Sequence, residues 1–140
     1  MKILAAYDGS NDADKALGRA IDIAKKFEAE LTVLYVVPEL ILPAVELSAD
    51  YGWRLNEAFE KEAKHTMTPV VERVACLPIA AKVLIEQGDP IETILDTAEA
   101  SGADLIILGS RGRHGAKRML LGSVSATVCE HAKCDVLIVK

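Results

Sequence analysis

The stretch ADLIILGSRGRHGAKRMLLGS, residues 103–123, decides the fold of this chain. It includes four consecutive aliphatic residues, 105–108, which predict a strand covered on both faces, as in a parallel sheet clothed by helices. It continues as a glycine-spaced loop and ends at Gly122 and Ser123, where a helix is expected to begin. Strand, loop and helix in this order are typical of the units from which open α/β sheets are built.

The rest of the chain alternates in the same way between aliphatic segments and segments with helical spacing. Strands are predicted at 2–7, 31–37, 81–86, 103–108 and 135–139. Helices are predicted at about 11–27, 52–74 and 90–101, and from 123 onward. This order predicts a single domain over residues 1–140, of the α/β class, with one open parallel sheet and helices on both faces.

Local signals support some of these helices and argue against the continuity of others. Ser10 or Asn11 is available as the N-cap of the first. Asp89 and Pro90 form a good helix start, with the aspartate as N-cap and the proline at the first helical position. Pro69 lies inside the second predicted helix, and because proline removes a backbone donor, we expect a kink or a restart there. Residues 38–51 do not fit the alternation and predict an excursion that holds at most a short helix.

The composition limits the classes of function. A net charge of −5 argues against general binding to nucleic acid or to an anionic membrane, because both require a basic surface. Apolar runs are far shorter than the roughly 20 residues of a membrane span, so we expect a soluble protein that is not exported. The three cysteines lack zinc-site spacing and predict free thiols in the cytoplasm. A redox pair of Cys129 and Cys134 is conceivable, but we favour buried, structural roles for both.

Positive charge is concentrated in the glycine-flanked stretch 109–123, which contains no acidic residue. Its four basic residues give the stretch +4 and leave −9 for the rest of the chain; they are Arg111, Arg113, Lys117 and Arg118. Glycines let the backbone approach an oxygen-rich ligand and turn successive N–H groups toward it, and a helix start adds further free N–H groups. The stretch therefore predicts a phosphate-binding loop.

A second turn of small residues, Asp8-Gly9-Ser10, follows the first predicted strand. In open parallel sheets, ligands bind beyond the carboxyl ends of the strands, where the strand order reverses. Two familiar phosphate motifs are absent, since the chain has no GxxxxGK[ST] sequence and the glycines at 109–115 do not form GxGxxG. The structural alternative for Asp8 is that it caps the first helix region or bonds turn amides. A structural role for Ser123, capping its helix through the hydroxyl, is compatible with amides offered to phosphate.

The spacing G-x2-G-x9-G-[ST] is matched by Gly109, Gly112, Gly122 and Ser123, and in this the chain resembles the ATP-binding branch of the universal stress protein family. The similarity extends along the whole length, through DGS at 8–10, LYVV at 34–37 and HAKCDVLIV at 131–139. The resemblance implies a five-stranded sheet ordered 3-2-1-4-5, with the first and fourth strands adjacent. It also implies bound ATP, accompanied by Mg²⁺ or Mn²⁺.

The resemblance further implies roles for individual residues, none of them catalytic. Asp8 is expected near the ribose or a phosphate-bound metal, the backbone of Val36 at the adenine edge, and Leu108 against the nucleoside. The remaining residues of the expected nucleotide site are Gly9, Ser10, Gly109, Ser110, Arg111, Gly112, Arg113, Gly122, Ser123, Val124 and Ser125. The family motif leaves the positions of Arg111 and Arg113 free, so these two are expected to contact phosphate without specificity.

The expected function is that of a regulatory or stress-protective ATP-binding module, present as a homodimer and acting on protein partners that the sequence does not identify. Residues 134–140 form the final predicted strand, and pairing of two such aliphatic edges about a two-fold axis would close a dimer. Slow metal-dependent ATP hydrolysis is one alternative, although the sequence shows no convincing base to activate water. A dimeric scaffold that binds a different anion is the other.

Overall fold

The computed structural model describes residues 1–39, 49–113 and 120–140, in which strands and helices alternate as the sequence predicts. The elements in chain order are β1 (Lys2–Ala6), α1 (Asn11–Phe27), β2 (Glu30–Pro38), α2 (Ala49–Ala75), β3 (Ala81–Gly88), α3 (Pro90–Ser101), β4 (Leu105–Gly109), α4 (Ser123–His131) and β5 (Asp135–Val139). The predicted strand ends differ from the observed ones by two residues at most.

All five strands form one parallel sheet in the order β3-β2-β1-β4-β5, which confirms the expected topology. Strand β1 is central, with Ile3 paired to Leu31 of β2 on one side and to Leu105 of β4 on the other. The strand order reverses between β1 and β4, because β2 and β3 are added on one side of β1, and β4 and β5 on its other side. The carboxyl ends of these two strands are therefore the place where a ligand is expected.

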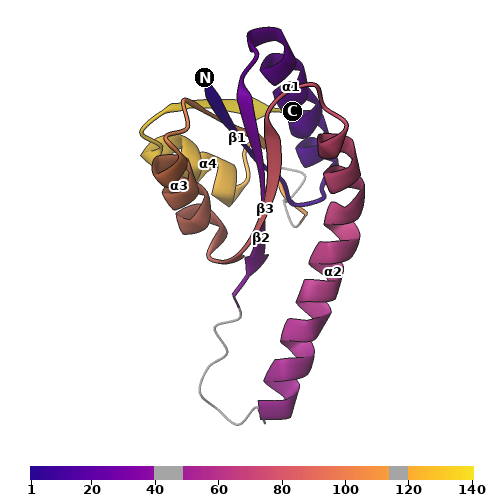
Figure 1. The fold of residues 1–140 in the computed structure, drawn as a ribbon. Coiled ribbons are helices and arrows are strands. Elements are labelled where there is room, and N and C mark those ends of the chain that lie inside the picture. The colour runs from indigo at the N-terminus through magenta and orange to yellow at the C-terminus, as the bar shows by residue number, and fades with distance from the viewer. Residues whose placement is uncertain (40–48, 114–119) are drawn as a thin grey trace.

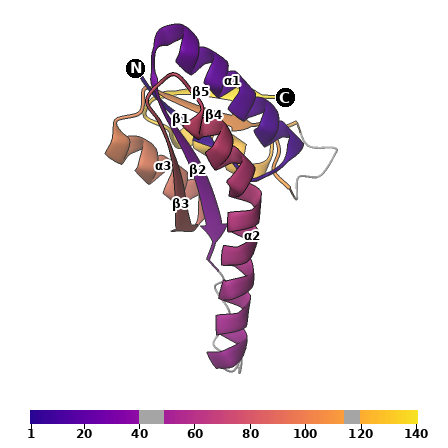
Figure 2. The same cartoon turned by 45° about the vertical axis from the view of Figure 1, so that its right-hand side comes forward.

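The two faces of the sheet are covered by different helices, as Figures 1 and 2 show. Helices α1 and α2 enclose one apolar core, whose buried members include Ile3, Leu17, Leu31, Met67 and Ile107. Helices α3 and α4 enclose the other, whose buried members include Leu4, Leu34, Ile94, Ile106 and Val128. Neighbouring strand residues such as Ile3 and Leu4 fall into opposite cores, because successive side chains of a strand point to opposite faces.

The predicted caps lie where the sequence places them. The Ser10 hydroxyl accepts a hydrogen bond from the Ala13 backbone nitrogen at 3.2 Å and so caps α1. The Asp89 carboxylate caps α3 by accepting bonds from the backbone nitrogens of Ile91 and Glu92, at 2.9 and 3.0 Å. Both contacts span only a few residues, which is why the local sequence is enough to predict them.

Helix α2 continues without interruption through Pro69, so the expected restart is wrong. Pro69 and His65 are both exposed. The His65 carbonyl, whose helical partner the proline removes, can therefore bond water instead. The helix begins at Ala49, and residues 40–48 of the expected excursion lie outside the described residues. Within the described ranges, no helix is long and apolar enough to cross a bilayer.

The three cysteines are free thiols. Cys76 and Cys129 are exposed, so the expected burial of Cys129 is wrong. The inward-facing residue of that part of α4 is its neighbour Val128, which is fully buried, and this turns Cys129 toward solvent. Cys134 is half-buried, and burial is the main reason why the pKa of its thiol is raised.

Candidate functional site

The two turns singled out in the sequence meet at the carboxyl ends of β1 and β4. The Asp8 carboxylate accepts a hydrogen bond from the Arg113 backbone nitrogen at 3.2 Å, and the Ser10 hydroxyl lies 3.4 Å from the Arg111 carbonyl oxygen, to which it donates. These bonds join residues 105 and 101 positions apart. We call residues 8–10, 109–113 and 122–125 together the switch-point site.

Asp8 holds the geometry of both turns. One carboxylate oxygen accepts from the Ser10 nitrogen at 3.0 Å within the first turn, and the other accepts from Arg113 across the sheet. A Cβ atom at Gly112 would lie 2.7 Å from that second oxygen, so the loop can approach Asp8 this closely only with glycine there. The structural alternative for Asp8, bonding of turn amides, is thus confirmed, while its ligand role stays a prediction.

Ser110 fastens the two ends of the glycine loop together. Its side chain is buried, and its hydroxyl donates to the Asp12 carboxylate at 2.8 Å. Its carbonyl accepts from the Gly122 nitrogen at 2.7 Å and from the Ser125 hydroxyl at 2.9 Å. Because the hydroxyls of Ser110 and Ser125 are committed within the chain, both residues shape the loop, and their expected contacts with phosphate stay predictions.

Helix α4 begins at the switch-point site without a side-chain cap. Gly122 occupies the N-cap position, and Ser123 is the first helical residue, with an exposed side chain. The structural role expected for Ser123, capping the helix, is therefore wrong, because the helix starts one residue too early for its hydroxyl to do so. The first turn of a helix has backbone N–H groups without helical partners, which makes this uncapped start suitable for an anion.

The motif glycines are required for different reasons. A Cβ atom at Gly109 would lie 2.7 Å from the Asp12 carbonyl carbon and 2.9 Å from the Ala13 nitrogen, so glycine is needed where β4 ends against the start of α1. At Gly122 the nearest atom would be 3.4 Å away, an ordinary contact, and its φ of −72° suits any residue. The contacts of the described residues thus require glycine at Gly109 but not at Gly122, where glycine is one of several residues that suit an N-cap.

The two arginines of the loop are paired with carboxylates that the sequence analysis did not assign to the site. The Arg111 Nε atom lies 3.6 Å from an Asp12 carboxylate oxygen. The hydrogen bond from Ser110 is the largest of the influences that lower the pKa of Asp12, and the charges of Lys15 and Arg111 act in the same direction. Asp12 lies in the first turn of α1, directly after the turn formed by residues 8–10, and this place at a helix start is the signal that could have found it.

Arg113 reaches helix α2. Its Nη1 atom donates to Glu62, and its Nη2 atom donates to the Thr66 hydroxyl at 3.3 Å. The hydrogen bond to Glu62 is the main reason why the pKa of Arg113 is raised. Glu62 and Thr66 are 51 and 47 residues away in the chain, so no local pattern marks them.

Tyr7 precedes the first turn and supports it. Its hydroxyl donates to the Asp14 carboxylate at 2.7 Å. Burial and the bond to Asp14 raise the pKa of Tyr7 to about 12. The phenol therefore stays protonated at neutral pH and serves as a fixed donor to the first turn of α1.

The two residues expected at the nucleoside lie in different environments. The Leu34 carbonyl accepts from the Tyr7 nitrogen, so the backbone of Leu34 faces β1, and Val36, two residues later, faces the same way. Strand β1 has ended at Ala6, which leaves the backbone groups of Val36 directed beyond its end. Leu108 is buried in the α3 and α4 core with 4% of its surface accessible, and its expected contact with the nucleoside stays a prediction.

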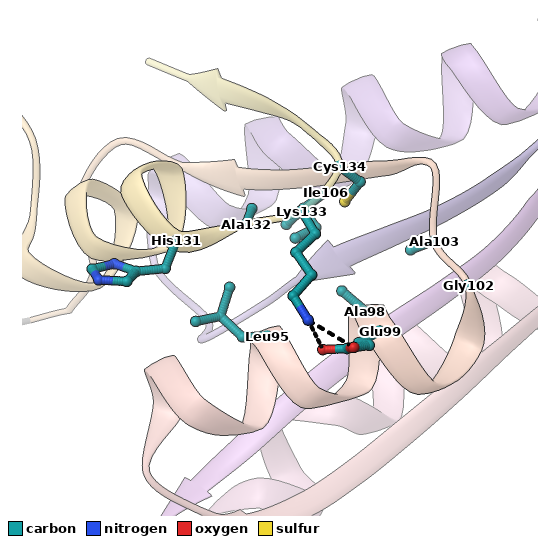
Figure 3. A pocket seen from close by; sticks show the side chains of 10 residues that line it. All are labelled: Leu95, Ala98, Glu99, Gly102, Ala103, Ile106, His131, Ala132, Lys133 and Cys134. Carbon is teal, nitrogen blue, oxygen red and sulfur yellow. Dashed lines mark hydrogen bonds and ion pairs between the residues drawn. The ribbon is translucent and has the colours of Figure 1, made fainter.

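A cavity of about 270 Å³ lies away from this site, between the carboxyl-terminal ends of α3 and α4 (Figure 3). Leu95, Ala98 and Ile106 contribute apolar surface to it, and an ion pair of Lys133 with Glu99, at 2.8 Å, spans one side. Its volume is below the range of ordinary small-molecule sites, and it contains no cluster of polar groups with a common target. The switch-point site is the better candidate.

Comparison with known proteins agrees with the glycine spacing. The model of the Universal stress protein family matches residues 1–140. The chain belongs to the universal stress protein family. Among its relatives, universal stress protein MJ0531 of Methanocaldococcus jannaschii is 36% identical over 140 residues, which cover 99% of this chain and 81% of that protein.

Solved structures of the family share the fold. Universal stress protein UspA from Lactobacillus plantarum superposes with a TM-score of 0.87 at 31% identity, covering 100% of this chain and 97% of that one. A universal stress protein in complex with cAMP superposes with a TM-score of 0.65 at 25% identity, covering 100% and 97%. Nucleotide binding therefore occurs among the structural relatives of this universal stress protein.

Proposed function

We propose that this universal stress protein binds ATP at the switch-point site and acts as a regulatory nucleotide-binding module. The observation that carries the proposal is Gly122, which stands at the uncapped start of α4 although the fold of the described residues does not require glycine there. A phosphate seated on the first-turn N–H groups supplies the missing reason, because a side chain at this position would stand in its way.

The remaining parts of ATP are assigned along the same edge of the sheet. The backbone of Val36, directed beyond the end of β1, offers a donor and an acceptor to the edge of adenine. Asp8 lies between this point and the glycine loop, where the ribose would pass. The bound cAMP of the related structure supports a nucleotide as the ligand class.

A metal ion is proposed to arrive with the nucleotide. Among the described residues, no group of three or more His, Cys, Asp or Glu side chains is arranged to hold a metal ion. Mg²⁺ is commonly bound by one or two carboxylates together with substrate phosphates, so Asp8 alone would suffice beside ATP. No observation on the described residues favours hydrolysis, and we propose binding as the function.

The protein is further proposed to act in the cytoplasm as a homodimer joined through residues 134–140. In the sheet formed by the described residues, β5 lies at one edge, with β4 as its neighbour. Its residues Val136–Val139 are half-buried in the single chain, and a second copy could cover them while pairing the open backbone edge.

Two variants of Ser123 test the ATP site. Ser123→Ala keeps the backbone amides and is expected to bind ATP as the wild type does, since the hydroxyl caps nothing. Ser123→Asp places a negative charge at the helix start, which favours the helix but repels phosphate, so ATP binding is expected to be lost in a folded protein. Circular dichroism checks the fold.

Thermal melting with and without Mg-ATP gives the readout. ATP at 100 times its dissociation constant is expected to stabilise the wild type and Ser123→Ala by about 2.7 kcal/mol, and Ser123→Asp not at all. Absence of any shift with ATP, ADP or AMP would contradict nucleotide binding. An equal shift in Ser123→Asp would show that the nucleotide binds elsewhere.

A further inference from the structure

The side chain of Arg113 lies across the turn after β1. A Cβ atom on Gly9 would be 3.0 Å from its Nη2 atom and 3.4 Å from its Nε atom. From there its two terminal nitrogens reach α2, where Nη1 donates to Glu62 and Nη2 donates to Thr66 at 3.3 Å. The loop after β4 is thus connected, over the end of β1, to the helix that packs on β2 and β3.

This position coincides with the path assigned to the nucleotide. A ligand that extends from the start of α4 to the backbone of Val36 must pass the end of β1, where the guanidinium of Arg113 now lies. Arginine recognises phosphate with the same fork of N–H donors that it offers to carboxylate. Glu62 therefore occupies donors of Arg113 that a phosphate would use.

From this contact we infer that Glu62 is a specificity-determining residue, which competes with ligand phosphate for Arg113 and thereby lowers the affinity for phosphate-rich ligands. The inference rests on the proposed function, because it concerns the same site. The inference also predicts a structural difference between the protein with bound nucleotide and the free protein. When phosphate takes Arg113, the loop after β4 loses its contact with α2.

The exposure of the pair suits a contact that a ligand can replace. The side chain of Arg113 is 36% exposed and that of Glu62 is 51% exposed. Ion pairs with this much solvent around them contribute little and are weakened by salt. Glu62 also lowers the affinity for phosphate in a second way, because its negative charge repels an approaching phosphate.

Isothermal titration calorimetry on the full chain tests the inference with Glu62→Gln. The variant keeps the length of the side chain and removes its charge. Glu60→Gln is the matched control, since Glu60 is also exposed and on α2, but two positions away and so on nearly the opposite side of the helix. Each protein is titrated with Mg-ATP and with adenosine at one ionic strength, and melting without ligand confirms that each is folded.

Glu62→Gln is expected to bind Mg-ATP about fivefold more tightly than the wild type, which corresponds to about 1 kcal/mol. Adenosine, which lacks phosphate, is expected to bind both proteins equally, and Glu60→Gln to behave as the wild type. An unchanged or weaker affinity of Glu62→Gln for Mg-ATP overturns the inference. So does an equal gain in Glu60→Gln or with adenosine, because either would show a general effect.

The outcomes separate this inference from the proposed function. If the wild type binds Mg-ATP and Glu62→Gln shows no gain, only the role of Glu62 is lost. If neither protein binds any nucleotide, the proposed function fails and the inference with it. If Glu62→Gln binds Mg-ATP where the wild type does not, the competition by Glu62 is supported, and ATP binding as the function of the wild type is contradicted.

Discussion

The carboxylate of Asp8 lies 3.2 Å from the backbone nitrogen of Arg113, so the turn after β1 and the loop after β4 share one hydrogen-bonded contact. The contact requires that β1 and β4 be neighbours, which is the point where the strand order of the sheet reverses. It also requires glycine at Gly112, because a Cβ atom there would lie 2.7 Å from the accepting oxygen. The topology and the glycine spacing therefore serve the same arrangement.

Asp8→Ala is expected to loosen both turns together. The substitution removes the acceptor for the nitrogens of Ser10 and Arg113, and two such bonds at a half-exposed site contribute about 1–2 kcal/mol to the free energy of unfolding. Urea denaturation measures this loss, and amide hydrogen exchange is expected to accelerate at Ser10 and Arg113 alike. Faster exchange at Ser10 alone would contradict the link between the two turns.

Two glycine substitutions are expected to differ in their effects: Gly109→Ala should mainly lower stability, and Gly122→Ala should mainly weaken ATP binding. Gly109→Ala places a methyl group 2.7 Å from the backbone of α1, so it should lower the free energy of unfolding by several kcal/mol, about the cost of a badly overpacked site. Gly122→Ala meets only ordinary contacts and should cost about 1 kcal/mol at most, the difference between glycine and alanine at an N-cap, while weakening Mg-ATP binding. Thermal melting and calorimetry measure the two quantities. A strongly destabilised Gly122→Ala would instead give this glycine a structural role.

The strands, the helices and two of the helix caps could be predicted from the sequence because their determinants are local. Runs such as 105–108 are buried on both faces, and Ser10 and Asp89 bond amides only two or three residues away. The strand order itself came from the family resemblance. The partners of Arg113 could not be predicted, because Glu62 and Thr66 reach it only once α2 has packed on the sheet.

The errors have equally specific causes. A kink or a restart is predicted at Pro69, and the restart does not occur. The helical hydrogen bond that the proline removes, to the His65 carbonyl, lies on an exposed side of the helix, where losing it costs less than in a core. The start of α4 was predicted at the correct residue, yet the capping role of Ser123 was wrong because a cap residue must precede the first helical residue. Sequence patterns locate an element more reliably than they assign the task of a side chain at its end.

Acid is expected to remove the contribution of Asp12 to stability. Its pKa is lowered in the folded protein, chiefly by the hydrogen bond from Ser110. The unfolded chain, with a pKa of about 3.9, therefore binds a proton first as the pH falls. The stabilisation is complete above this value and is lost as the pH falls through the lower pKa of the folded state.

Asp12→Asn provides the measurement. It should lower the free energy of unfolding by about 1 kcal/mol at pH 6, with a smaller difference from the wild type at about pH 3. Asp22→Asn, an exposed carboxylate on the same helix, should change it by less than about 0.5 kcal/mol at pH 6. A difference between the wild type and Asp12→Asn that stays constant with pH would exclude a contribution from the charge of Asp12.

The proposed dimer depends on the outward backbone groups of β5. Asp135 donates to Asp104 and Val139 accepts from Ser110, so alternate residues of β5, starting with Asp135, face β4, and Ile138 faces the open edge. Ile138→Pro removes an outward N–H group without removing a bond to β4, and prolines are tolerated at such edges. Sedimentation at micromolar concentration should show monomers for this variant and dimers for the wild type and for Ile138→Val, which keeps the N–H group. Because the substitution also removes the Ile138 side chain from its packing against the α3 and α4 core, circular dichroism must show that the variant is folded. A folded Ile138→Pro that remains dimeric would place the interface elsewhere.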